Sequence, residues 1–81
     1  MDTENLVKMV NHIGDFFSAE PDPDIGVAGV TDHLRRFWES RMRNAIIQHY
    51  LAGGAGLSDI ARAAVAKLAA ERKALKQSAD G

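Results

Sequence analysis

Four arginines and the only tryptophan of the 81-residue chain lie in one short run, residues 33–43. Tryptophan and arginine are enriched where proteins bind each other, because they combine a large contact area with directional hydrogen bonding. This run therefore predicts a surface that binds a partner protein. Its candidate interface residues are Arg35, Arg36, Phe37, Trp38, Arg41 and Arg43. The alternative is that the two aromatic rings fill the protein's own core, and both interpretations hold if one ring turns inward and the other outward.

Three histidines are the residues best suited to bind a metal ion. His12, His33 and His49 lie on separate segments, so they would meet only if three helices converged, with Asp32 or Glu39 as a fourth ligand. No two of the histidines have the i, i+3 or i, i+4 spacing of a helical metal-binding pair. We therefore expect no metal site, and an independent metal-dependent enzyme is the weakest interpretation.

A glycine cluster and two serines are further candidates for chemistry. The N–H groups of Gly53, Gly54 and Gly56 could hold a phosphate, but the lysine of a phosphate-binding loop and a preceding strand are missing. A turn between helices that needs positive φ explains these glycines. Neither Ser40 nor Ser58 lies in a nucleophile motif. The sequence thus predicts neither catalytic nor cofactor-binding residues in this chain.

Residues 57–64 look like the first helix of a bacterial helix-turn-helix. Such a motif continues through a tight turn into a recognition helix, whereas residues 65–70 prolong the same helix. The net charge of −1 also argues against a nucleic-acid binder, because neutralised phosphates supply most of such a protein's affinity. A small helix-turn-helix-like DNA-binding regulator is therefore only the alternative function.

Apolar residues recur at helical spacing along the chain, and no segment has the alternation of a strand. Asp2 or Thr3 is expected to cap the first helix. Two prolines separate it from a second helix, for which Asp22 is the expected cap. The apolar positions expected along the first and second helices are Leu6, Met9, Val10, Ile13, Phe16, Phe17, Val27, Val30, Leu34, Phe37 and Trp38.

The same spacing predicts two further helices. Ser40 is the expected cap of the third, and Ser58 that of the fourth, which is expected to end near Gln77. The inward positions expected on them are Met42, Ala45, Ile46, His49, Tyr50, Ile60, Ala61, Ala64, Val65, Leu68, Arg72 and Leu75. The fold class is thus all-α, a small four-helix domain over residues 1–77 with a bend or break near Glu39–Ser40 and a flexible tail over residues 78–81.

Composition and charge limit the function further. The chain has no cysteine, which excludes disulfides and thiolate ligands for iron–sulfur clusters. Its apolar runs, such as residues 25–30 and residues 51–57, are far short of a membrane span. The start does not resemble a signal peptide, so we expect a cytoplasmic location. Residues 1–32 carry seven acidic residues and one lysine, whereas residues 33–51 carry four arginines and one glutamate.

Several stretches, in this order and spacing, resemble the delta subunit of cytoplasmic NAD-dependent formate dehydrogenases. They are residues 6–17, residues 27–30 leading into residues 33–38, then residues 41–43 and residues 53–57. The resemblance covers about residues 5–70, and its specific parts are the aromatic and basic run and the glycine turn before Leu57. The family commonly has Asp-Pro after the tryptophan. This chain has Glu39–Ser40 there, which departs in residue type but keeps a residue that starts a helix.

The resemblance implies a non-catalytic accessory subunit of an enzyme complex that oxidises formate with NAD. Its expected partners are the large catalytic subunit and the other redox subunits, with neither nucleic acid nor membrane. Those partners would carry a molybdenum or tungsten pterin, iron–sulfur clusters and FMN. The accessory subunit would stabilise the catalytic subunit, or assist its assembly and the insertion of its pterin.

Overall fold

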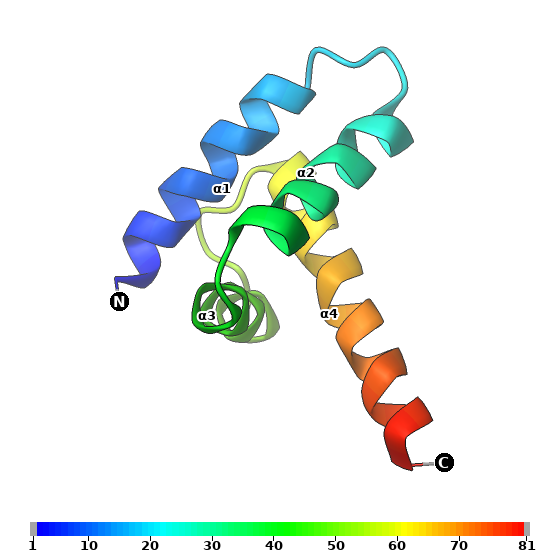
Figure 1. The fold of residues 1–81 in the computed structure, drawn as a ribbon. Helices are drawn as coiled ribbons and strands as arrows, with labels where there is room; N and C mark the ends of the chain where they lie inside the picture. The colour runs from blue at the N-terminus through cyan, green and yellow to red at the C-terminus, as the bar shows by residue number, and fades with distance from the viewer. Residues whose placement is uncertain (1, 81) are drawn as a thin grey trace.

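The computed structural model describes the backbone of residues 2–80 and the side chains of residues 2–73. Four helices follow one another along the chain: α1 (Thr3–Phe17), α2 (Pro23–Phe37), α3 (Ser40–Leu51) and α4 (Asp59–Asp80) (Figure 1). Within residues 2–80 there is no β-strand. The prediction of an all-α domain with four helices is therefore confirmed.

Three of the helices begin at the capping residues that the sequence predicts. Asp2 and Asp22 each accept a hydrogen bond from the backbone N–H two residues later, at 3.1 and 2.9 Å. Pro23, which directly succeeds Asp22, occupies the first turn of α2. The Ser58 hydroxyl accepts a hydrogen bond of 3.3 Å from the N–H three residues later. These caps satisfy N–H groups that have no partner within the helix, so they fix where each helix begins.

The break between α2 and α3 occurs at Trp38 and Glu39, as predicted. The predicted cap was wrong, because Glu39 rather than Ser40 precedes the first helical residue, and its side chain makes no capping hydrogen bond. Trp38 already has extended backbone angles, φ −87° and ψ 138°. α2 thus ends at Phe37, and α3 begins at Ser40. A cap at Ser40 would have placed the start of α3 one residue later. The Ser40 hydroxyl instead accepts a hydrogen bond of 3.2 Å from Arg43 Nη2.

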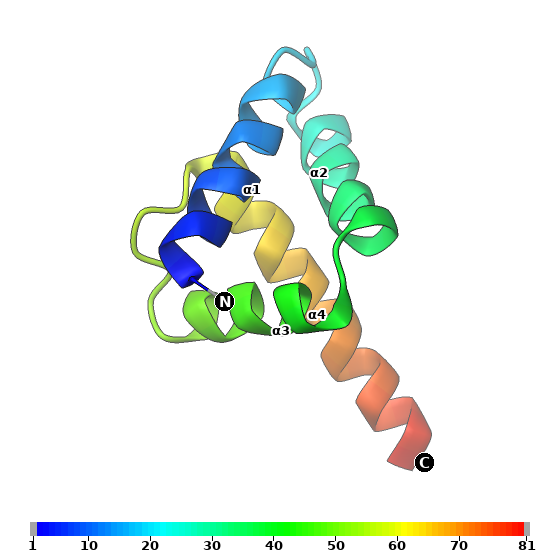
Figure 2. The same ribbon diagram turned by 60° about the vertical axis from the view of Figure 1, so that its left-hand side comes forward.

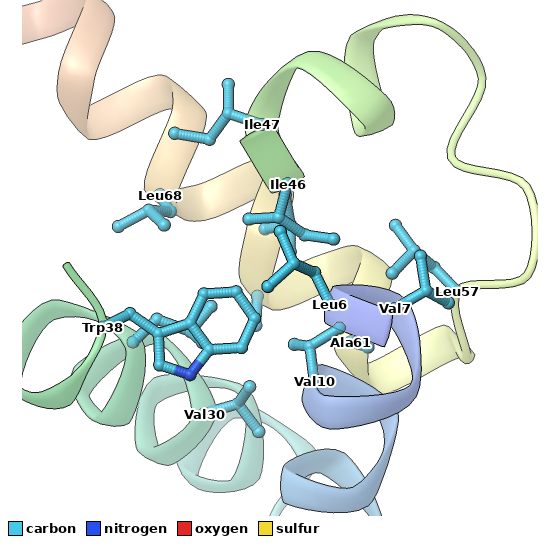
Figure 3. Packing of buried hydrophobic residues seen from close by; sticks show 13 residues of the cluster. Leu6, Val7, Val10, Val30, Trp38, Ile46, Ile47, Leu57, Ala61 and Leu68 are labelled. Atoms are coloured by element: carbon cyan, nitrogen blue, oxygen red, sulfur yellow. The ribbon is translucent and has the colours of Figure 1, made fainter. Parts of the chain in front are cut away.

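The core lies where α2 crosses α4, and α1 and α3 complete it from the other sides (Figures 1 and 3). Apolar side chains from all four helices meet there, together with Trp38 and Leu57 from the connections. The buried apolar residues are Leu6, Val7, Val10, Val30, Leu34, Trp38, Ile46, Ile47, Leu57, Ala61, Ala64, Val65 and Leu68. Alanines at the crossing allow the two helix backbones to approach closely.

One polar side chain lies inside this core. Thr31 is fully buried at the contact between α2 and α4. Its Oγ1 lies 2.9 Å from the carbonyl oxygen of Val27 and 3.3 Å from that of Ala64. Because a buried hydroxyl without a partner is costly, these two acceptors explain how a threonine is tolerated here.

The inward faces differ from the expected ones at several positions. On α1, Val7 and Gly14 are buried, whereas Met9 and Phe16 are exposed. On α2, Phe37 points to solvent, and on α3 Ile47 is buried beside Ile46. The reason is geometric: successive residues on a helix point about 100° apart. An apolar stripe wider than the contact therefore cannot be buried along its whole width.

The C-terminal half of α4 extends past the other three helices, as two views of the molecule show (Figures 1 and 2). This helix runs to Asp80 and thus includes residues 78–80, beyond the expected end at Gln77. The expected inward position Leu75 lies outside the described side chains. The flexible tail stays a prediction. In the described part of the chain, no helix combines the length and the apolar character needed to cross a membrane.

Candidate partner interface

Phe37 and Trp38 are consecutive residues with opposite environments. Trp38 is 5% exposed and packs in the core near Leu6, Val10 and Val30 (Figure 3). Phe37 is 71% exposed, as the last residue of α2. One ring is turned inward and the other outward, which is the combination that the sequence left open. Trp38 therefore contributes to folding, and Phe37 is the aromatic ring available at the surface.

Arg35 and Arg36 project from the last turn of α2 and are exposed. Arg36 Nε lies 3.0 Å from an Asp32 carboxylate oxygen, and Arg35 Nη1 lies 3.6 Å from the other oxygen. Arg35 Nε also donates a hydrogen bond of 3.1 Å to Glu71 on α4. Both guanidinium groups are thus held in place at the surface by carboxylates while they still face solvent.

The other two predicted arginines have different environments. Arg43 is half-buried, and its Nη1 donates to the backbone carbonyl oxygens of Arg35, at 3.3 Å, and of Trp38. This side chain of α3 therefore bonds to the end of α2 and stabilises the α2–α3 junction. Arg41 is exposed, and no ion pair involves it among residues 2–73. Of the predicted interface residues, Arg35, Arg36, Phe37 and Arg41 are thus at the surface.

A shallow groove of about 290 Å³ lies next to Phe37, between α1 and α2. It is lined by Ile13, Phe16, Phe17 and His33. The His33 and Phe37 rings pack with centroids 4.8 Å apart, and the Phe16 and Phe17 rings pack edge to face at 5.1 Å. The exposed aromatic surface thus extends from the end of α2 across to α1.

Sequence reasoning missed Phe16 as a surface residue, because it was counted with the inward stripe. Its exposed fraction is 76%. The adjacent pair Phe16 and Phe17 held the relevant signal: two neighbouring helical residues point about 100° apart, so both are buried only where the core covers a wide face of the helix. Phe17 is the inner one, and its ring packs against Gly29 of α2, where an added Cβ would overlap the ring.

The remaining candidate sites are used in turns and helix contacts. His49 Nε2 lies 2.8 Å from the carbonyl oxygen of Ala55, and Arg62 donates to the carbonyl oxygens of Gly53 and Gly54 at 3.0 and 2.8 Å. The three glycines of this turn have positive φ, as predicted. Over the described side chains, no three His, Cys, Asp or Glu residues group together as a metal site would require.

The segment that resembled a helix-turn-helix leads into one uninterrupted helix. Residues 59–80 are helical throughout, so no turn separates residues 57–64 from residues 65–70. A recognition helix connected by a tight turn is therefore not formed by this part of the chain. The groove between α1 and α2, the exposed Phe37 and the exposed arginines therefore remain as the candidate binding surface.

Comparison with known protein families agrees with this description. Residues 5–65 match the family described as NADH-dependant formate dehydrogenase delta subunit FdsD. The match includes α1, α2 and α3 and the first turns of α4. No curated protein and no solved structure gives a significant match. The family match covers most of the 81 residues, and the chain therefore belongs to the FdsD family of formate dehydrogenase delta subunits.

Proposed function

We propose that this chain is a non-catalytic accessory subunit that binds and stabilises the large catalytic subunit of an NAD-dependent formate dehydrogenase. The family match over residues 5–65 is the observation that carries the proposal. A delta subunit has partners in its complex, and we assign the direct contact to the catalytic subunit. The same proposal places the complex in the cytoplasm.

The surface chemistry supports a role in binding. Phe37 and Phe16 are large rings exposed to solvent, and rings of this size contribute most to binding when a partner covers them. Arg35 and Arg36, which precede Phe37 in α2, are held by carboxylates, so little side-chain freedom is lost when a partner docks. Aromatic anchors beside ordered guanidinium groups are typical of an interface.

We also propose how the redox centres are divided. The molybdenum or tungsten pterin, the iron–sulfur clusters and FMN reside in the partner subunits, and this chain assists assembly and insertion of the pterin. The absence of cysteine supports this division for the clusters, because thiolates are their usual ligands.

Affinity purification of the chain from its native host, at its natural expression level, tests the binding role. The expected result is stoichiometric recovery of the large formate dehydrogenase subunits. A matched control is the tagged Phe37→Ser variant, in which an exposed ring is removed and folding is preserved. Recovery of the chain alone, or with DNA but without redox subunits, would contradict the proposal.

The assembly role needs a separate experiment. The catalytic subunit is purified from cells with and without this chain, and its pterin and iron contents are measured. The proposal predicts less pterin per subunit in the cells that lack the chain, with similar iron. Equal pterin contents would show that the chain has no part in insertion, while the binding role would still be tested by the purification.

A further inference from the structure

The groove between α1 and α2 is apolar, is open to solvent and has exposed carboxylates near one end. We propose that it binds one amphipathic helix of a partner subunit, with an apolar face that enters the groove and lysines or arginines along its edge. This inference deepens the proposed function and rests on it, because the helix is assigned to a subunit of the same complex.

The groove lies between α1 and α2, two helices that diverge from the loop that joins them (Figure 2). Ile13 and Phe17 are partly buried and pack on the core, whereas Phe16 rises at the rim. On the α2 side the half-buried ring of His33 packs against Phe37. The result is an apolar floor with the exposed ring of Phe16 at its α1 rim, while the ring of Phe37 lies beyond His33.

This form favours a helix over a small molecule. Ligand sites are usually enclosed and have several polar groups that orient the ligand. Here the lining is apolar except for one imidazole, that of His33, and the groove is open along its length. An amphipathic helix in a groove needs only a row of apolar anchors at i, i+3 or i+4, and i+7. Phe16 at the rim would pack against one side of such a row.

Charge near the turn between α1 and α2 favours a basic edge on the partner at that end of the groove, whereas Arg35 and Arg36 lie at the other end, beside Phe37. The four residues that line the groove lie within residues 9–34. This segment includes five acidic residues and neither lysine nor arginine. Asp15, Glu20, Asp22 and Asp24 are exposed at the end where α1 turns into α2. The fifth, Asp32, pairs with Arg36. Uncompensated carboxylates at one end attract a cationic segment and repel an acidic one.

The same charge argues against a second copy of this chain as the occupant. In a symmetric dimer formed by this face, the same patch contacts itself. When the two grooves run in the same direction, the acidic end of each approaches carboxylates of the other copy, and the exposed phenylalanines gain contacts only at that electrostatic cost. When they run in opposite directions, the acidic end meets the arginines of the other copy, and the crosslinking experiment below tests this arrangement. A partner helix with basic edges contacts the same rings without this repulsion.

A photoreactive phenylalanine analogue in place of Phe16 tests which segment enters the groove. The chain with this analogue is assembled into the complex in cells and irradiated, and the crosslinked peptide is identified by mass spectrometry. The matched control has the analogue in place of Leu51, an equally exposed apolar residue at the end of α3. We expect the crosslink at position 16 to select one basic amphipathic helix of a redox subunit, and the control to leave that helix unlabelled.

Other crosslinking results would overturn the inference. A crosslink from position 16 to a second copy of the chain would assign the groove to a homodimer. A crosslink to an acidic segment, or no crosslink within a complex that has assembled, would show that a basic helix does not occupy the groove. If wild-type chain fails to recover any redox subunit, the proposed function itself fails, so the two failures are distinguishable.

Charge reversal supplies a second, independent test. Asp15→Lys combined with Glu20→Lys changes two exposed side chains that neither cap a helix nor form an ion pair among the described side chains. We expect this variant to bind the isolated catalytic complex at least tenfold more weakly than wild type at low salt, with the difference shrinking as salt increases. Circular dichroism should remain that of wild type. Unchanged affinity at low salt would contradict the assignment of a basic edge.

Discussion

The two sides of the α2 C-terminus use similar residues for different purposes. On the inner side, Trp38 is covered by the core and Arg43 binds the carbonyl oxygens that end the helix. On the outer side, Phe37 and Arg36 face solvent beside an apolar groove. Aromatic and arginine side chains that are neighbours in sequence thus belong to two structures, one that holds the fold together and one that is open to a partner.

This difference teaches that residue type alone does not identify an interface in a short chain. A domain of this size has few large side chains, so its core recruits the same tryptophan and arginine that would mark a binding surface elsewhere. Burial separates the two roles. Changes on the inner side should therefore act on stability, and changes on the outer side should act on association.

The largest effect is expected from Trp38→Ala. Removing a buried indole leaves a cavity and loses apolar contacts, which costs about 3–5 kcal/mol of unfolding free energy. Because a core this small supplies about 3–5 kcal/mol in total, most of the variant should be unfolded at 25 °C. Urea denaturation monitored by circular dichroism measures this. Phe37→Ala is the control, with an expected change under about 0.5 kcal/mol, and equal stability losses in the two variants would remove the distinction between the sides.

Arg43→Ala should have an intermediate effect. The guanidinium group donates to two backbone carbonyl oxygens and to the Ser40 hydroxyl, and hydrogen bonds to a charged group contribute about 1.5–3 kcal/mol. Partial exposure reduces this, so we expect a loss of about 1–2 kcal/mol. Thermal unfolding gives the value. Arg41→Ala is the matched control on the same helix, and a loss as large in that variant would mean that these hydrogen bonds are not what stabilises the junction.

Thr31→Val probes the inner side where α2 meets α4. The substitution keeps the shape of the side chain and removes the hydroxyl that bonds to Val27 or Ala64. Both carbonyl groups belong to helices, so the free energy lost when they no longer accept from the hydroxyl is small. We expect destabilisation of about 1 kcal/mol. Chemical denaturation resolves a change of this size. A variant more stable than wild type would show that this hydroxyl costs stability.

The smallest stability effect is expected from Arg35→Gln on the outer side. Its partners Asp32 and Glu71 are themselves partly exposed, and solvent-exposed pairs typically contribute about 0–1 kcal/mol. We expect a change below about 0.5 kcal/mol in water, and none in high salt. A loss above about 1.5 kcal/mol would place Arg35 among the residues that hold the fold together.

The fold could largely be predicted from the sequence because the residues that start and end its helices act locally. Asp22 with Pro23, the positive-φ glycines and Ser58 each determine a helix end through groups only a few residues away. A break near Glu39–Ser40 was predicted for the same reason, and it lies at Trp38–Glu39, one residue earlier. The family resemblance, based on short motifs in order, was confirmed by the match over residues 5–65.

The candidate interface was harder to predict from the sequence because burial depends on contacts between distant segments. Whether Trp38 or Phe37 faces inward is decided by where α1 and α4 lie, and Arg43 acts on carbonyl groups that only the observed turn brings within reach. The groove required both α1 and α2, so no single stretch of sequence indicated it. Periodicity predicted the helices correctly, but not which edge of each apolar stripe is covered.

Binding of Phe37→Ser to the purified catalytic subunit tests the central claim most directly. Calorimetry gives the dissociation constant, and circular dichroism of the same sample gives the fold. We predict unchanged helical content with a dissociation constant raised roughly thirtyfold, which corresponds to the loss of about 2 kcal/mol expected for an anchor residue. A variant that is folded and binds with the wild-type dissociation constant would contradict the claim that the outer side of α2 is the partner interface.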